Sequence, residues 1–283
     1  MYVESRTSIT RRGTMPITTL KRSVTGANHV RQQVRCQDAG KTLVFKDFTV
    51  MAVADGHGSA RCPFSDTGSK IAVNVFCDGV LNVYRKQPGK TEFRRFFEEK
   101  GDKPFAKAIV QEWRRRVARA HAGKIRTKKA SGSTENLDEI AMLYGSTLLG
   151  IVITKDFFYV FQIGDGNIIY IENGTLRELT MGEKMLGVET NSLALSAPWK
   201  YVCTKVYDTT EPRVVPNMFL LATDGFANSY LNQKEFYKGC KEYYQAINLY
   251  GEEKVSKNLR NWLMETSRMG CGDDITVAIA HTT

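Results

Sequence analysis

The chain has 283 residues, of which 42% are hydrophobic, and this is enough apolar content to bury the core of one large domain or two small ones. Its longest apolar stretch, residues 146–163, is interrupted by Lys155 and Asp156, so that neither piece reaches the length of a membrane span. Forty Lys and Arg residues against thirty Asp and Glu residues give a net charge of +10. The basic segments lack the interleaved aromatic residues typical of nucleic-acid binding, so we expect a globular protein that binds neither membrane nor nucleic acid.

The N-terminal residues 1–22 are rich in Arg, Ser and Thr and contain no apolar core of a secretory signal. Their composition resembles that of an organelle transit peptide, but a basic tail or an additional edge strand is the preferred interpretation. None of the cysteines forms a Cys-x-x-Cys pair, which argues against a zinc site and against a disulfide framework. These cysteines are Cys36, Cys62, Cys77, Cys203, Cys240 and Cys271. Reduced, mostly buried thiols and a cytoplasmic location are therefore predicted.

The first predicted elements are a strand at residues 48–55 and a helix at residues 69–85, which carries apolar residues on one side. A second helix follows, in which an apolar residue recurs every fourth position: Phe105, Ile109, Trp113 and Val117. This spacing places the intervening arginines on the outer face. The basic segment 112–130 is either a solvated helix face running into a loop or a docking surface for acidic or phosphorylated partners. Residues 128–139 predict a loose loop.

The middle of the chain is rich in β-branched and aromatic residues and predicts a series of strands. These strands lie at residues 145–154, 157–165, 167–174, 175–180, 200–209 and 218–225. Short polar turns at residues 155–156 and 173–174 indicate antiparallel hairpins. Two helices, at residues 235–249 and 252–269, precede a last strand at residues 274–281. Strands massed in the middle with helices in pairs favour an α+β fold with helices packed outside antiparallel sheets.

An aspartate follows a buried strand at four places, namely Asp55, Asp165, Asp224 and the pair Asp273 and Asp274. A single Asp-Gly step is a common turn, which is the alternative interpretation at each place. If the sheets bring the four strand ends together, the negative charge exceeds what a protein interior tolerates without cations. Magnesium or manganese fits best, because the chain offers oxygen ligands and neither thiolates nor a multi-histidine cage.

Six short motifs follow one another across nearly the whole chain: Gln37-Asp38, Asp55-Gly56-His57-Gly58, Gly145-Ser146-Thr147, Gly164-Asp165-Gly166, Thr223-Asp224-Gly225 and Asp273-Asp274-Ile275-Thr276-Val277. This ordered set resembles the metal-dependent Ser/Thr protein phosphatases of the type 2C (PPM) family. The resemblance implies a four-layer α-β-β-α sandwich, in which two central antiparallel sheets are flanked by helix pairs. It also implies that residues 23–283 form the catalytic domain.

The resemblance further implies a centre of two Mn²⁺ or Mg²⁺ ions at one end of the sandwich. Asp55 corresponds to the carboxylate that bridges the ions, and Gly56 contributes its backbone carbonyl. Asp224 and Asp273 correspond to the remaining protein ligands of one ion. Asp38 belongs to the acidic pair that holds the second ion and its waters.

Two more positions take their roles from the resemblance: Asp165, with Asp224, corresponds to a weaker third metal site, and His57 to the general acid. Two cations about 3.5–4 Å apart can neutralise a phosphate dianion and hold an activated water in line with phosphorus. The serine or threonine alkoxide that leaves needs a proton, which an imidazole beside the metals can donate. The expected reaction is hydrolysis of phosphoserine and phosphothreonine in proteins without a covalent intermediate. The alternative for His57 is an ordinary turn histidine.

The chain departs from the family pattern in three respects. Gln37 stands where many members have glutamate and cannot supply negative charge, which predicts a more loosely held second ion. Asp274 replaces the usual asparagine and either raises metal affinity or offers an alternative ligand to Asp273.

The third departure is the phosphate-binding arginine of the family, which does not correspond to a single clear position in this sequence. His29, Arg31, Gln33, Arg35 and Gln37 alternate onto one face if this segment is an extended strand. We therefore favour Arg31 for the substrate phosphate, with Arg35 as the alternative and His29 as a third candidate.

The expected partners are phosphorylated protein substrates and a cognate Ser/Thr kinase, and a monomer is expected. One alternative is a catalytically weak pseudophosphatase that binds phosphoproteins or kinases. The presence of all the expected metal-binding aspartates argues against it. Another is a basic nucleic-acid adaptor, which would show steeply salt-dependent binding.

Overall fold

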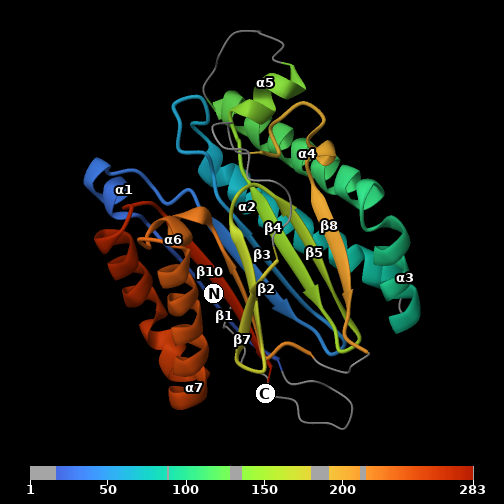
Figure 1. Ribbon diagram of the computed structural model, residues 1–283. Helices are drawn as coiled ribbons and strands as arrows, with labels where there is room; N and C mark the ends of the chain where they lie inside the picture. Colours follow the sequence, from blue (N-terminus) through green and yellow to red (C-terminus); the bar gives the residue numbers. More distant parts are fainter. Residues whose placement is uncertain (1–16, 88, 128–135, 180–190, 211–214, 283) are drawn as a thin grey trace.

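Two antiparallel five-stranded sheets pack face to face, and helices cover the outer face of each sheet (Figure 1). The chain is seen here in a computed structural model, which describes residues 17–87, 89–127, 136–179, 191–210 and 215–282. The predicted four-layer α-β-β-α sandwich is confirmed.

Each sheet contains strands that are distant in the sequence. The first sheet has the order β1 (Ile17–Val24), β10 (Ile275–Thr282), β9 (Met218–Ala222), β6 (Asn167–Glu172) and β7 (Thr175–Glu178). The second sheet has the order β2 (Ala39–Val44), β3 (Thr49–Ala54), β4 (Leu148–Ile153), β5 (Phe157–Ile163) and β8 (Cys203–Asp208). The predicted hairpins β4–β5 and β6–β7 are confirmed as antiparallel pairs.

The longer helices divide between the two sheets. The second sheet is covered by α2 (Ser65–Lys86), α3 (Lys90–Lys100) and α4 (Lys103–Thr127), and the first by α7 (Gln233–Met269). The shorter helices are α1 (Ala27–Gln32), α5 (Leu137–Met142), α6 (Asp224–Asn228) and a 3-10 turn at Pro198–Lys200. Helix α7 breaks at Gly251, whose φ of 78° favours glycine, so its two halves correspond to the two helices predicted there.

The apolar core lies in three layers, one between the sheets and one under each set of helices. Strand β3 shows why, because its side chains alternate between two layers. Val50, Ala52 and Ala54 face helices α2 to α4, whereas Met51 and Val53 face the other sheet. A strand buried on both faces carries mainly apolar residues, and in β3 the first residue, Thr49, is the one exception.

Helix α4 buries the apolar stripe predicted for it. Phe105, Ile109, Trp113 and Val117 are all buried against the core under the second sheet. The indole Nε1 of Trp113 donates a hydrogen bond of 3.0 Å to the carbonyl oxygen of Gly68 in α2. The stripe therefore fixes which face of the basic helix remains on the outside.

The arginines of α4 are only partly a free surface, and the prediction that all of them lie on the exposed face is wrong. Arg114 pairs with Asp138 of α5 at 2.5 Å, and Arg116 pairs with Asp78 of α2 at 2.8 Å. Both arginines are half-buried and tie α4 to its neighbours. Among the arginines of α4 whose side chains the structure describes, Arg115 and Arg119 remain exposed, and Arg115 pairs with Glu112 of the same helix at 2.6 Å.

The predicted loop at residues 128–139 is only partly tested, because residues 128–135 lie outside the described residues. The prediction is wrong for its last residues, which begin helix α5. Asn136 accepts a hydrogen bond from the Asp138 backbone, and the Glu139 carboxylate accepts one from the Asn136 backbone. This capping box explains why such a polar segment starts a helix.

The N-terminal segment supplies an edge strand within the described residues, since β1 pairs with β10 along its whole length. Residues 1–16 of the predicted tail lie outside them. All cysteines are free thiols; Cys62, Cys77 and Cys240 are buried, and the others are half-buried or exposed. None of the described helices has the length and apolar content needed to cross a membrane.

Candidate active site

Asp55 lies directly after β3, in a turn that is clamped to the segment before β4. Its backbone N–H donates to Thr147 Oγ1 at 2.9 Å, and the Thr147 N–H donates to the Asp55 carbonyl at 2.8 Å. Gly56 forms a bridge with Ser146, and the backbone N–H of His57 donates to Gly145. The motif around Gly145 therefore holds the Asp55 turn in place, a role that its sequence alone does not reveal.

Asp38 precedes β2 and reaches across from the second sheet to the first. Its side chain is buried and accepts a hydrogen bond of 2.7 Å from the Thr223 hydroxyl. The same hydroxyl accepts a bond from the Thr276 backbone in β10. Thr223 thus joins Asp38 to β9 and β10, and the sequence analysis missed this contact.

Asp224 and Asp273 lie at the end of the first sheet where β9 ends and β10 begins. Asp224 is the first residue of α6, and Asp273 stands two residues before β10. Between them the backbone passes so closely that a Cβ on Gly225 would lie 2.1 Å from the Asp274 carbonyl oxygen and 3.3 Å from the Asp273 Cβ. Glycine is therefore required at this position for the two acidic segments to meet.

Burial and neighbouring carboxylates raise the pKa values of Asp38, Asp55 and Asp224. Burial, followed by the charges of Asp38, Asp224 and Asp273, raises the pKa of Asp55 well above its usual value. Burial is also the main reason that the pKa of Asp38 rises to about 8 and that of Asp224 to about 6. The Asp55 carboxyl is within hydrogen-bonding reach of both Asp38 and Asp224. The strand ends therefore gather the negative charge expected from the sequence.

Asp165 belongs to the same group through its charge. It follows Gly164, whose φ of 111° lets the chain turn sharply between β5 and β6. After burial, the Asp165 charge is the largest cause of the raised pKa of Asp224. Asp165 therefore lies near Asp224, and the third metal site expected for this pair stays a prediction.

The donor set fits hard divalent cations. Carboxylate oxygens that are buried together need positive charge, and hard cations prefer oxygen ligands. The side-chain oxygen Oε1 of Gln37 is buried without a hydrogen-bond partner among the described residues, and a Cβ on Gly58 would lie 2.9 Å from it. Among the same residues, no three acidic, His or Cys side chains surround a single position that could hold an ion. The carboxylates converge, but their side chains are not closed around a common point.

Asp274 is engaged in a different way from its neighbour Asp273. Its Oδ1 accepts a bond of 2.6 Å from the Gly26 N–H and lies 2.9 Å from His29 Nδ1, and its Oδ2 accepts a bond of 2.6 Å from the Gln37 N–H. The side chain is buried, whereas Asp273 is exposed. The carboxylate of Asp274 thus anchors the segment that leads to Asp38, which the sequence analysis did not foresee.

The predicted extended strand that carries Arg31 and Arg35 is wrong. Residues 27–32 form helix α1, and Gln33 ends it with a left-handed φ of 58°. Both arginines are exposed, and Arg31 donates to the Asn28 side chain. No contact in the described part of the chain joins either arginine to the carboxylates, so the alternation that selected them does not exist. Of the three phosphate candidates, His29 is the one that contacts the site, through Asp274.

The crowded carboxyls predict that the metal-free protein loses stability as pH rises. Their folded pKa values lie above the unfolded ones, so their contribution to the free energy of unfolding is complete below about pH 4 and is lost as pH rises through about 6 and 8. Urea unfolding in chelator from about pH 5 to pH 8 measures this loss. Asp38→Asn should flatten the dependence, and an unchanged slope in this variant would contradict the prediction.

With this geometry in hand, comparison with known proteins gives the family. A family model described as protein phosphatase 2C matches residues 25–264. The chain therefore belongs to the protein phosphatase 2C family. A comparison with curated proteins found no match.

Solved structures share the fold at low sequence identity. The catalytic domain of the serine/threonine phosphatase PstP, in complex with two manganese ions, is 12% identical with a TM-score of 0.52 and covers 94% of this chain and 98% of its own. The S. agalactiae serine/threonine phosphatase is 14% identical, with a TM-score of 0.59 and coverage of 94% and 100%. PppA of Pseudomonas aeruginosa, a regulatory component of T6SS, is 16% identical, with a TM-score of 0.55 and coverage of 95% and 99%. At these identities the likeness shows the fold.

Proposed function

We propose that this protein hydrolyses phosphoserine and phosphothreonine in proteins with the help of two Mn²⁺ or Mg²⁺ ions. The observation that supports the proposal is that Asp38, Asp224 and Asp273 lie close enough to Asp55 for their charges to raise its pKa, at one end of a protein phosphatase 2C fold. Such ions, when bound, neutralise the phosphate and lower the pKa of a water. The manganese in the PstP structure supports the choice of metal.

The residues of this chain take distinct roles in the proposal. Asp55 would help to hold both ions, and the Gly56 carbonyl would add a ligand beside it. Asp224 and Asp273 complete one site, since both lie at the same end of the first sheet. Asp38, held by Thr223, serves the other site. Asp165, next to Asp224, forms a weaker third site.

We assign the ligand role to Asp273 rather than to Asp274. Both oxygens of Asp274 already accept backbone hydrogen bonds, and its side chain is buried. In this assignment the extra negative charge of Asp274 holds the loop of Gln37 and Asp38 in position. The neutral Gln37 supplies an oxygen but no charge.

His57 is the proposed general acid, because it follows the bridging carboxylate within two residues and its ring packs against Gly145. A Cβ on Gly145 would lie 2.8 Å from His57 Cδ2, so glycine leaves room for the imidazole. From this place His57 can give a proton to the serine or threonine oxygen as it leaves phosphorus.

The proposal is tested by assaying a phosphothreonine peptide with manganese and then with excess chelator. We expect release of phosphate that requires manganese and stops on chelation. Activity that survives complete chelation would contradict a metal-dependent mechanism. Manganese binding without release of phosphate would instead identify a pseudophosphatase, an alternative that the neutral Gln37 favours.

The exposed arginines of α4 are proposed to capture acidic phosphoproteins, whether substrates or a partner kinase. Replacing Arg115 and Arg119 with glutamine should lower kcat/KM for an acidic phosphoprotein at low salt by about tenfold and leave a small aryl phosphate unaffected. The reason is that charges at the rim act mainly on encounter.

The matched control for this prediction is Arg116→Gln, because Arg116 is half-buried and pairs with Asp78 of another helix, whereas Arg115 is exposed and pairs with Glu112 of its own helix. This substitution should lower the free energy of unfolding by about 0.5–1 kcal/mol. It should lower kcat/KM for the acidic phosphoprotein by less than the replacement of Arg115 and Arg119 does. Equal losses on the phosphoprotein and the small substrate would show that the exposed arginines support the fold or the site instead.

A further inference from the structure

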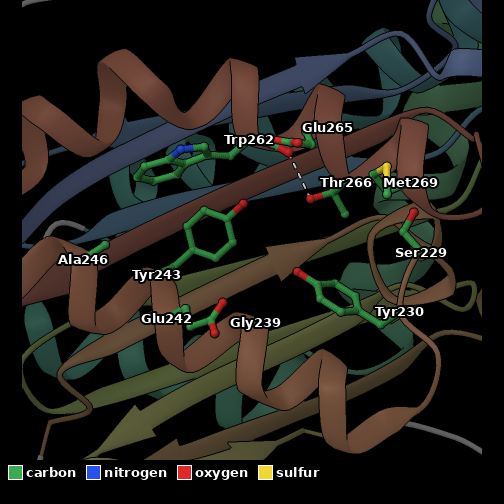
Figure 2. A pocket seen from close by; sticks show the side chains of 10 residues that line it. All are labelled: Ser229, Tyr230, Gly239, Glu242, Tyr243, Ala246, Trp262, Glu265, Thr266 and Met269. Atoms are coloured by element: carbon green, nitrogen blue, oxygen red, sulfur yellow. Dashed lines mark hydrogen bonds between the residues drawn. The ribbon is translucent and has the colours of Figure 1, made fainter.

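A groove of about 500 Å³ runs between the two halves of α7, on the outer side of the first sheet (Figure 2). The turn after α6 closes one end of it with Ser229 and Tyr230. Side chains from residues 233–250 form one wall, and side chains from residues 252–269 form the other. Its volume lies within the range of about 300–1,000 Å³ typical of ligand sites.

Aromatic rings dominate the walls of this groove. Tyr243 and Trp262 face each other from the two halves of α7, with ring centroids 6.0 Å apart and planes at 61°. Tyr230 enters from the α6 turn, and Figure 2 shows its hydroxyl and that of Tyr243 directed into the groove. Burial raises the pKa of both tyrosines, so they remain neutral phenols. The groove is therefore lined by aromatic rings, of which Tyr230 and Trp262 are half-buried and Tyr243 is buried.

The charged side chains that line the groove are both acidic. Glu242 and Glu265 stand on opposite walls and are exposed, and the lining contains no Lys or Arg. Glu265 also contacts Arg268, at 3.8 Å on the solvent side. In a chain whose net charge is +10, an aromatic groove with only acidic charges is a local reversal of sign.

We propose that this groove binds an arginine side chain presented by a basic peptide segment of another protein. A guanidinium group can stack on Tyr or Trp rings while it pairs with a carboxylate, and its planar shape suits both contacts better than an ammonium group does. An apolar helix would leave Glu242 without a partner, whereas Glu265 already pairs with Arg268, and a phosphorylated segment would be repelled by Glu242. The binding does not depend on the chemistry of the carboxylate site.

The test is fluorescence anisotropy with a labelled peptide in which arginines alternate with glycine and serine, measured at low salt on the whole protein. We expect saturable binding that Glu242→Gln weakens by about tenfold. The same peptide with lysine in place of arginine should bind more weakly. Hydrolysis of an aryl phosphate by Glu242→Gln should be unchanged, which separates this proposal from the proposed catalytic function.

The matched control is Glu99→Gln, which removes the same charge from an exposed position on α3, over the opposite sheet. It should bind the arginine peptide as tightly as the original protein. If Glu242→Gln and Glu99→Gln weaken binding equally, the peptide responds to the net charge of the protein and not to the groove, and the proposal is overturned. Equal affinity for the lysine peptide would overturn the guanidinium assignment, as would tight binding by a Glu242→Gln protein.

Discussion

Asp55→Asn should abolish manganese-dependent phosphatase activity, with a fall in kcat/KM of about a thousandfold or more. Asp55 is the carboxyl within reach of both Asp38 and Asp224, so its charge serves two ions in the proposed centre. An amide cannot replace a bridging carboxylate, because it carries no charge and has a single oxygen. Calorimetric titration with manganese should show that the high-affinity binding is lost.

The same substitution should leave the fold intact and should stabilise the metal-free protein. The raised pKa of Asp55 means that its ionised form is unfavourable in the folded state, and asparagine removes that cost. A higher melting temperature in chelator, together with lost manganese binding, is the expected pair of results. Asp102→Asn, at an exposed position before α4, is the control and should change neither. Undiminished manganese binding by Asp55→Asn would refute the assignment of this carboxylate.

His57→Gln should separate substrates according to their leaving groups. Activity on a phosphopeptide should fall by about a hundredfold or more, because a serine or threonine alkoxide needs a proton as it leaves. Activity on p-nitrophenyl phosphate should fall much less, since nitrophenolate leaves without one. The ratio of kcat/KM for the two substrates is the measurement, and manganese affinity should be unaffected.

The control for His57→Gln is His281→Gln. His281 lies near the end of β10, away from Asp273, which precedes the start of this strand. His281 Nδ1 lies 3.2 Å from Glu252, so its loss should change stability and leave the substrate ratio as it was. Equal losses on the two substrates in His57→Gln would indicate that His57 orders the Asp55 turn and does not donate a proton.

The packing of helices outside antiparallel sheets could be predicted because it leaves a direct trace in the sequence, whereas the four-layer sandwich was implied by the resemblance to the family. Strands such as β3 and β4 are buried on both faces and consist almost entirely of apolar residues, and α4 repeats an apolar residue at every turn. The aspartates at strand ends could be predicted for the same reason, because a carboxyl that directly follows a buried strand must lie at the end of the sheet. Local pattern was sufficient for the strands, the helices and the aspartates at strand ends, but the roles of the individual aspartates came from the resemblance.

The segment between β1 and β2 could not be predicted in this way, because its conformation depends on a residue far along the chain. The alternation of residues 29–37 agrees with a strand, yet the Asp274 carboxylate binds the N–H groups of Gly26 and Gln37 and the helix α1 forms between them. A contact across 248 positions has no local signature. Arg31 and Arg35 were chosen for the phosphate because of that alternation. Since the segment is not a strand, the reason for choosing them is lost.

The central place of β10 also has a consequence for the order in which the protein is made. This last strand lies between β1 and β9, and the residues just before it supply Asp273 and the anchor for the Gly26 segment. A ribosome that has not yet translated this stretch therefore carries a nascent chain in which β1 has no neighbour in its sheet and one carboxylate is missing. Vectorial synthesis thus delays assembly of the proposed site until β10 emerges.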